Sequence, residues 1–455
     1  EAPPLTRYNG TMSSNRLRIR DAVHGDITLT EEEGRLLDTP QMQRLRGVHQ
    51  LGLAYLVFPG ARHSRFEHSI GTLHMTQVLI DAIQENALWE GGRGLQPEVV
   101  RILRAAALVH DVTHIPFGHN IEDQSGLLER HDSPARFQTV LSDETALGRE
   151  LARQGIREEV LSVLGAGEEV EEPYLQQMIS DSICPDLMDY LRRDAYYTGL
   201  DLQYDQRVAE YFRVDEKGRL FVDCAKEGLL REDVVSEILR MLQARYFFSE
   251  RVYYHHAKVA AGAMIARAVE DLLEEGRLRP EELQGTTDEG LRLLLRERGK
   301  GERTRSLLGR LETRRLYKRV AVFPYQKNAE VQERLIAELF APGARERRVA
   351  FERAREEEFR GRFGKDVEVL LYCPSRRMQL KECETLVRFP NEELRSLSSY
   401  REELPRVRDL EDSYLRLWKV YVLSSATERE ERKFLQERVG EALPYARDSY
   451  LIQSG

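Results

Sequence analysis

The spacing of apolar and polar positions predicts a mainly helical protein up to about residue 300. Residues 66–87 repeat apolar side chains at helical spacings. Residues 97–111, ending in RILRAAALVHD, are apolar almost all round, which is typical of a helix at the centre of a core. Further helices are predicted at 133–164, 174–199, 229–275 and 279–296.

Both ends of the chain follow other patterns. RIRDAVHGDITLT predicts a strand, a turn at Gly25 and a second strand, followed by two short helices broken at Pro40. Beyond residue 310, VAVFPY, DVEVLLYCP and LWKVYVLSS carry the β-branched and aromatic residues of short strands, separated by charged helical stretches. We expect a mainly α fold. Its parts would be an N-terminal extension (1–15), a helical core (16–300) and a smaller C-terminal α+β region (301–455).

Composition narrows the class of protein. The net charge of -9 over 455 residues does not favour general nucleic-acid binding, although a local basic groove stays open. The four cysteines show no CxxC spacing, which argues against a zinc knuckle and a disulfide framework. No apolar stretch approaches the roughly 20 residues that cross a bilayer. We therefore expect a cytoplasmic protein without a membrane segment.

The histidines are unevenly distributed. All eleven lie at or before His256, and eight fall between His49 and His131. Within that group the pair His110-Asp111 ends an apolar helical run. An imidazole and a carboxylate side by side in a buried helix would be desolvated without a shared partner, and a divalent metal fits that role.

Four residues form a candidate metal site: His68, His110, Asp111 and Asp186. Two imidazoles and two carboxylates suit Mn, Fe, Zn or Mg and leave coordination positions open.

A helix beginning near Pro185 would carry Asp186, Tyr190 and Asp194 on one face, in a row about 12 Å long. Such a row could span a nucleotide sugar and its phosphates. The alternative is that Tyr190 and Asp194 pair with Arg192 or Arg193.

Other histidines surround the predicted metal site. Pro116 and Gly118 turn the chain out of the helix, so His114 and His119 could line the mouth of a pocket. With Arg65 and His131 they offer donors for phosphate oxygens, and a histidine can also act as a general acid. The pair His131-Asp132 lies in a polar stretch and is interpreted as a phosphate contact, not as a second metal site. Four further histidines are assigned to structure or packing: His24, His49, His63 and His74.

Three segments carry a resemblance. RLRGVHQLGLAYLVFPGARHSRFEHSIG, LVHDVTHIPFGH and DLMDYLRRDAYYTGL resemble the HD-domain deoxynucleoside triphosphate triphosphohydrolases, over roughly residues 16–260. The resemblance implies that the four residues above bind the metal. It implies catalytic roles for Asp111 and for His114 or His119 as the acid. The substrate contacts that it implies are Gln50, Leu51, Arg65, His131, Tyr190, Asp194, Tyr254 and Lys258.

The resemblance implies a metal-dependent enzyme that cleaves a dNTP to deoxynucleoside and tripolyphosphate by water attack at the α-phosphate. It also implies a homo-oligomer, often regulated by a nucleotide, with manganese among the candidate metals. One position departs from the family pattern, because Leu187 stands where a basic residue usually follows the last metal aspartate. Two alternatives therefore stay open. One is a phosphodiesterase or nuclease acting on single-stranded nucleic acid or a modified nucleotide, and the other is a non-catalytic nucleotide-sensing module.

Overall fold

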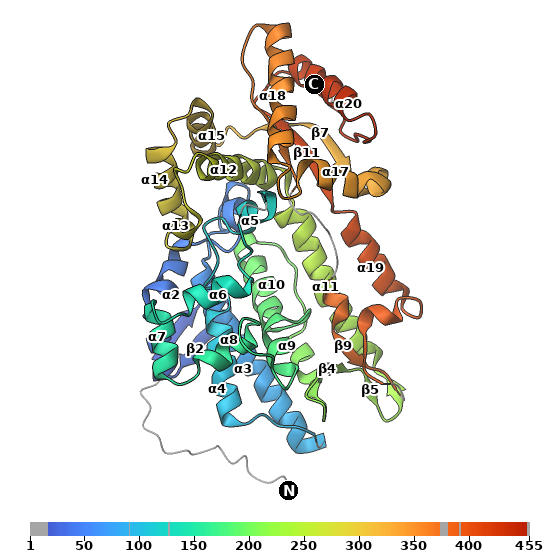
Figure 1. The fold of residues 1–455 in the computed structure, drawn as a ribbon. Coiled ribbons are helices and arrows are strands. Elements are labelled where there is room, and N and C mark those ends of the chain that lie inside the picture. The colour runs from blue at the N-terminus through green and yellow to red at the C-terminus, as the bar shows by residue number, and fades with distance from the viewer. Residues whose placement is uncertain (1–16, 91, 126–127, 374–380, 391–392, 453–455) are drawn as a thin grey trace.

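The computed structural model describes residues 17–90, 92–125, 128–373, 381–390 and 393–452, so the predicted extension 1–15 lies outside the described residues. Helices dominate these residues, which confirms the predicted mainly α class (Figure 1). No helix among the described residues is both long and apolar enough to span a membrane.

The α-helices are α1 (Glu31–Leu37), α2 (Pro40–Arg44), α3 (Arg65–Glu90), α4 (Pro97–Val109), α5 (His119–Ser125), α6 (Pro134–Val140), α7 (Ala146–Arg153), α8 (Arg157–Val163), α9 (Tyr174–Ser180), α10 (Pro185–Thr198), α11 (Glu232–Phe248), α12 (His256–Glu274), α13 (Pro280–Gln284), α14 (Asp288–Arg298), α15 (Glu302–Glu312), α16 (Tyr325–Asn328), α17 (Gln332–Leu339), α18 (Arg345–Phe363), α19 (Pro405–Leu415) and α20 (Arg429–Ala442). The strands are β1 (Leu17–Asp21), β2 (Gly25–Leu29), β3 (Phe212–Val214), β4 (Leu220–Asp223), β5 (Ala225–Lys226), β6 (Leu229–Leu230), β7 (Lys318–Pro324), β8 (Val369–Tyr372), β9 (Leu386–Arg388), β10 (Arg395–Ser396) and β11 (Lys419–Ser424).

The predicted N-terminal hairpin is present as β1 and β2, which pair antiparallel. Gly25 adopts a φ of 79°, a left-handed conformation that glycine reaches without strain. The side chain of Thr30 caps α1 while Glu33 reaches back to the Thr30 backbone, and Pro40 opens α2 as predicted.

The centre of the molecule is a packed group of helices in which α3 contacts both α4 and α10. Gly71 of α3 faces Asp189 of α10, and a Cβ at this glycine would lie only 2.0 Å from the Asp189 Oδ1 atom. The missing side chain therefore allows the two helices to approach closely.

Longer predicted helices are divided. The stretch 133–164 forms α6, α7 and α8, because Ser133 and Thr145 cap new helices. The stretch 229–275 forms β6, α11, a π-helical turn η4 (Ser249–Tyr253) and α12.

The C-terminal region contains the three predicted strands as the antiparallel sheet β7-β11-β8. A second sheet, in the order β10-β9-β4-β3, was not predicted. In it β9 pairs in parallel with β4, and apolar residues on both sides of residue 300 share one core cluster. The C-terminal region therefore packs against the helical core, and the exact domain boundaries stay a prediction.

Candidate metal and phosphate site

The four predicted metal ligands come together. His68 lies in the first turn of α3, His110 caps the end of α4 beside Asp111, and Asp186 lies in the first turn of α10. The His68 Nε2 atom is 2.8 Å from the Asp186 Oδ1 atom and 3.8 Å from the Asp111 Oδ2 atom. The His110 Nε2 atom is 3.6 Å from the Asp111 Oδ1 atom and 3.6 Å from the Asp186 Oδ1 atom.

Both imidazoles of this quartet are oriented as metal ligands. His68 Nδ1 donates to Asp189 Oδ2 at 2.7 Å, and His110 Nδ1 donates to the Ala107 carbonyl at 2.8 Å. Each Nε2 lone pair is thereby directed at the quartet, and the His110 Nε2 atom is buried without a hydrogen-bond partner. Ligand bonds of about 2.0–2.2 Å separate pairs of ligand atoms by about 3 to 4.4 Å, close to the separations found here. The residues therefore fit a divalent metal.

The charges of the quartet also call for a cation. Burial alone would lower the pKa of His68, but hydrogen bonds to Asp186 and Asp189 raise it to about 10. Burial would raise the pKa of Asp186, but the neighbouring imidazoles of His110 and His68 hold it below its usual value. The carboxylates thus keep a positive charge between them, which a proton or a metal ion can supply. The Asp186 side chain is 34% exposed, so the quartet is accessible.

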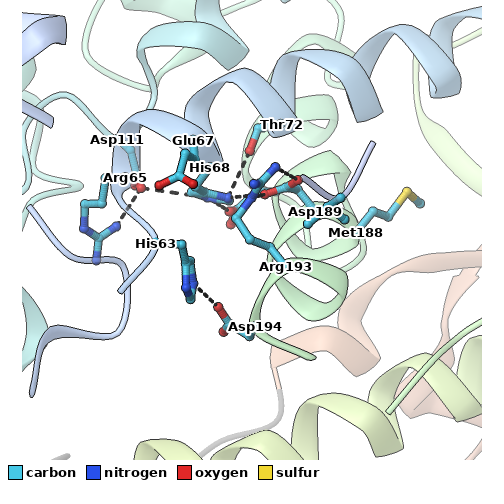
Figure 2. Close-up of polar contacts among 12 residues, drawn as sticks. His63, Arg65, Glu67, His68, Thr72, Asp111, Met188, Asp189, Arg193 and Asp194 are labelled. Carbon is cyan, nitrogen blue, oxygen red and sulfur yellow. Dashed lines mark hydrogen bonds and ion pairs between the residues drawn. The ribbon is translucent and has the colours of Figure 1, made fainter. Parts of the chain in front are cut away.

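Asp189 holds the metal-ligand candidate His68 in place through its Nδ1 atom. The sequence analysis did not name Asp189. This fully buried carboxylate accepts from His68 Nδ1 and from two nitrogens of Arg193 at 2.9 Å (Figure 2). It also accepts from His24 Nε2 at 2.6 Å. Arg193 also donates to Asp21 of the β1–β2 hairpin at 2.8 Å. His24 was assigned to structure or packing, and its bond to Asp189 is a structural role of this kind. The spacing of Asp189 and Arg193, one turn apart behind Asp186, was the available signal.

Two of the predicted phosphate contacts, Arg65 and His114, lie against the carboxylate of Asp111. Arg65 Nη1 donates to Asp111 Oδ2 at 2.6 Å, and His114 Nε2 lies 3.1 Å from Asp111 Oδ1. The rings of His114, His119 and His131 contact one another, with ring centroids 3.7 to 5.5 Å apart. The chain turns here at residues 117 and 118, which have φ values of 59° and 43°. The residues proposed to meet phosphate are therefore clustered.

The predicted sugar contacts follow α10. Asp194 Oδ1 accepts from His63 Nε2 at 2.8 Å, and Asp194 Oδ2 accepts from Tyr253 Oη at 2.6 Å. Tyr190 lies one turn nearer the metal ligands, where its ring meets that of His68 edge-on at 6.4 Å.

The sequence left open that Tyr190 and Asp194 pair with Arg192 or Arg193. Arg193 does not pair with them, because its guanidinium bonds Asp189 and Asp21 instead. Beside the predicted sugar region, the Gln50 Oε1 atom is buried without a hydrogen-bond partner, and Leu51 is buried.

The π-helical turn η4 decides which tyrosine meets Asp194. Tyr253, at the end of η4, donates to that carboxylate, whereas the sequence analysis named Tyr254. A π-turn holds one residue more than an α-turn and therefore shifts the register of the side chains that follow. Lys258, also named from the sequence, places its Nζ atom 5.3 Å from the centre of the Tyr253 ring.

A basic side chain that the sequence analysis missed, Arg245, lies within electrostatic range of Asp186. Leu187 itself is buried in the core. Arg245 of α11 is within electrostatic range of Asp186, Tyr190 and Tyr253. Burial alone would lower the pKa of Arg245, but interaction with these groups raises it, so the guanidinium stays charged. A cation on another helix therefore lies within electrostatic range of the site.

Comparison with known proteins defines the class. The family model "HD domain" matches residues 65–194, and the model "HD associated region" matches residues 222–439. The chain therefore contains an HD domain, and the resemblance stated from its motifs is confirmed.

Within that class, this chain is 29% identical over 286 residues to human deoxynucleoside triphosphate triphosphohydrolase SAMHD1. The match covers 55% of this chain and 44% of the relative. It is 29% identical over 339 residues to the SAMHD1 homolog of Dictyostelium discoideum, covering 69% and 61%. It is 30% identical over 312 residues to an uncharacterized protein of Methanocaldococcus jannaschii, covering 68% and 60%. The chain thus spans between 44% and 61% of the length of these relatives.

Solved structures share the fold. A hypothetical protein from Aquifex aeolicus superposes with a TM-score of 0.66 at 22% identity, covering 93% of this chain and all of that one. A phosphohydrolase from Bacteroides thetaiotaomicron gives 0.65 at 19% identity, covering 90% of this chain and all of that one. The HD domain supports a hydrolase whose histidines and aspartates could hold a divalent metal.

Proposed function

We propose that this protein is a metal-dependent dNTP triphosphohydrolase. Water would attack the α-phosphorus, the bond to the 5′ oxygen would break, and deoxynucleoside and tripolyphosphate would leave. A divalent ion held by His68, His110, Asp111 and Asp186 would supply Lewis acidity at the phosphate and lower the pKa of a water molecule. The tautomers of both histidines and their ligand separations support this assignment.

The triphosphate would lie between two groups of cationic or donor side chains. Arg65 and the histidine cluster approach from the side of Asp111, and Arg245 approaches from the side of Asp186. Charge-assisted hydrogen bonds from such groups hold phosphate oxygens and stabilise charge that develops on them. Arg245 would thereby supply the positive charge that the family usually places at the position of Leu187.

Protonation of the departing 5′ oxygen would fall to His119 rather than His114. Burial and the nearby Arg65 hold the pKa of His114 well below its ordinary value, which disfavours the imidazolium form that a general acid needs. His119 is exposed at the start of α5 and its ring contacts both neighbouring histidines. His114 would instead help to fix Asp111, its partner at 3.1 Å.

The deoxyribose would bind along α10. Asp194 and Gln50 would meet the 3′-hydroxyl, Tyr190 would pack on the sugar, and Leu51 would leave no room for a 2′-hydroxyl. One observation carries this choice of substrate. The helix that supplies the metal ligand Asp186 also supplies, two turns on, the carboxylate of Asp194, whose partners His63 and Tyr253 hold it in place.

The nuclease alternative loses part of its support. It was motivated by Leu187 and by the basic segment from Arg345 to Arg362. Arg348 bonds Glu270, Arg345 bonds Asp271, and Arg355 and Arg360 bond acidic residues of their own region. Most of that positive charge is therefore neutralised within the chain.

Product identification tests the proposal. Metal-loaded protein is incubated with each dNTP, each rNTP and single-stranded DNA, and products are separated by chromatography. We expect deoxynucleoside and tripolyphosphate from dNTPs, loss of turnover in His110→Ala, and intact oligonucleotide. Oligonucleotide cleavage would favour the nuclease, and nucleotide binding without turnover under any metal would favour the sensing module. A manganese preference, a homo-oligomer, a regulatory nucleotide and a cytoplasmic location stay predictions.

A further inference from the structure

One buried carboxylate joins two loops of the site. Asp288 lies in the first turn of α14 and is only 1% exposed. Its Oδ2 atom accepts from the backbone N–H of His49 at 3.1 Å and from the His49 Nδ1 atom at 2.6 Å. Its Oδ1 atom accepts from the backbone N–H of Phe117 at 3.0 Å. Thr287 caps α14 itself, so both oxygens of Asp288 serve the two loops.

The first of these loops carries two of the predicted sugar contacts. His49 directly precedes Gln50 and Leu51 in the chain. The Gln50 N–H donates to the His63 carbonyl at 3.0 Å, so the loop is fixed by His63 on one side and by Asp288 on the other. The Gln50 Oε1 atom is buried without a hydrogen-bond partner. Its position therefore depends on the backbone that Asp288 holds.

The second loop is a strained turn beside the predicted phosphate contacts. Phe117 has a φ of 59°, a left-handed conformation that is unfavourable for a bulky residue. Such conformations persist only where the surroundings hold them, and here the Phe117 ring is buried and its N–H bonds Asp288. A Cβ at Gly118 would lie 3.2 Å from Arg65 Nη2 and 3.5 Å from His114 Nδ1. Asp288 thus holds a turn that lies directly against Arg65 and His114.

Neighbouring contacts tie the same parts together. Arg44 donates to the carbonyl of Thr286, close to Asp288 in the chain, at 3.0 Å and to the His114 carbonyl at 2.8 Å. The apolar residues that α14 and the two loops bury in one cluster are Leu53, Ile115, Phe117, Leu291 and Leu295. The start of α14 is therefore a common support for both loops.

We propose that Asp288 is a positioning residue that keeps the loop 49–51 and the turn at Phe117 and Gly118 in fixed positions relative to each other, and thereby sets the preference for deoxyribose over ribose. The choice of sugar rests on the proposed function, in which Leu51 leaves no room for a 2′-hydroxyl. An asparagine at position 288 would keep one acceptor oxygen for one loop and turn its NH₂ group toward the donor of the other. The loop 49–51 would then loosen, and Leu51 would no longer exclude ribose.

Substrate selection tests this role. The kcat/KM of Asp288→Asn is compared with that of the wild type for each dNTP and the matching rNTP, with Mn²⁺ present. We expect the value for dNTPs to fall at least about tenfold, since a misplacement of about 1 Å can cost about 100-fold in rate. We also expect the ratio of dNTP to rNTP values to fall. Loss of folded protein alone would lower both values equally and leave the ratio unchanged.

Asp448→Asn is the matched control. The Asp448 Oδ1 atom accepts from the backbone N–H groups of Val322 at 2.9 Å and Tyr450 at 2.8 Å, in the C-terminal region. The control therefore removes the same kind of support from two other segments. It should leave the ratio of dNTP to rNTP values at that of the wild type.

Hydrogen exchange of backbone amides measures the support without turnover. The amides of His49 and Phe117 should both exchange faster in Asp288→Asn than in the wild type, and at the wild-type rate in Asp448→Asn. His49→Ala removes one of the three donors to Asp288 and should change both measurements in the same direction at smaller size. This variant keeps the test decisive if Asp288→Asn does not fold.

An unchanged ratio of dNTP to rNTP values in the folded variants would overturn the inference, and so would unchanged exchange at both amides. A wild type that hydrolyses no dNTP, or turns over rNTPs equally well, would instead reject the proposed function. Faster exchange at both amides in Asp288→Asn would then still support the positioning of the two loops. The two failures are therefore distinguishable.

Discussion

Asp189→Asn should weaken both the fold and the metal site, although Asp189 is not itself a predicted ligand. Its carboxylate accepts from His68, His24 and two nitrogens of Arg193, and it is fully buried. An asparagine at this position keeps one acceptor oxygen and turns an NH₂ group toward two of the donors. The variant also leaves Arg193 with Asp21 as its remaining carboxylate partner.

The expected magnitude follows from these contacts. Removing one partner from a buried ion pair costs about 3 to 5 kcal/mol, because the other charge stays buried. Loss of the carboxylate that orients a metal-binding histidine typically lowers metal affinity about 10- to 100-fold. His68 would lose the hydrogen bond that directs its Nε2 atom at the metal. We therefore expect both losses together in Asp189→Asn.

Two measurements check this prediction: the free energy of unfolding from urea titration, and the Mn²⁺ affinity from equilibrium dialysis. His24→Ala removes a single donor to Asp189 and should show the same two losses at smaller size. Asp143→Asn is the control, because Asp143 is exposed and pairs with Arg157 at the surface, where ion pairs contribute little. The reasoning fails if Asp189→Asn binds Mn²⁺ as tightly as the wild type does.

Three further outcomes are expected. Metal-free protein should lose stability as the pH rises from about 6.5 through 10, because native His68, whose pKa is raised to about 10, holds a proton that the unfolded chain releases. Bound metal should remove this dependence, and urea titrations across pH with and without metal measure it. Gly71→Ala should cost about 1 to 3 kcal/mol of unfolding free energy, because its Cβ would lie 2.0 Å from Asp189; an unchanged urea midpoint would contradict this. Tyr253→Phe should raise the KM for dNTPs far more than Tyr254→Phe, and equal effects in steady-state assays would reject the assignment of Tyr253 to Asp194.

The predictable part of the site came from residues that are close in sequence or set by helical periodicity. His110 and Asp111 end an apolar helix, so their burial could be inferred from the pattern alone. Asp186 and Asp194 lie on one helix, so their shared face followed from a period of 3.6 residues. The sequence also named His68 as a candidate ligand beside them, and its Nε2 atom lies 2.8 Å from the Asp186 Oδ1 atom.

Long-range pairing lay beyond the sequence pattern. The strands β3 and β4 are short. In the sheet, β4 pairs with β9, which lies more than 160 residues further along the chain. Strands of three or four residues give too few positions for a period of two to be recognised. The hairpin residue His24 was assigned to structure or packing, but its partner could not be named, because only the folded chain brings it within 2.6 Å of Asp189.

The shift from Tyr254 to Tyr253 shows why the chemistry of a motif and its register are separate problems. The motif SERVYYHH supplies two adjacent tyrosines, and either one satisfies a pattern that asks for a phenol near the sugar. The choice depends on whether the backbone completes an α-turn or a π-turn between α11 and α12. That choice is made by packing, since Ser249 and Val252 within η4 are both buried in the core. Side-chain identity therefore predicted a phenol in this segment, while tertiary packing determines that Tyr253 is the tyrosine that bonds Asp194.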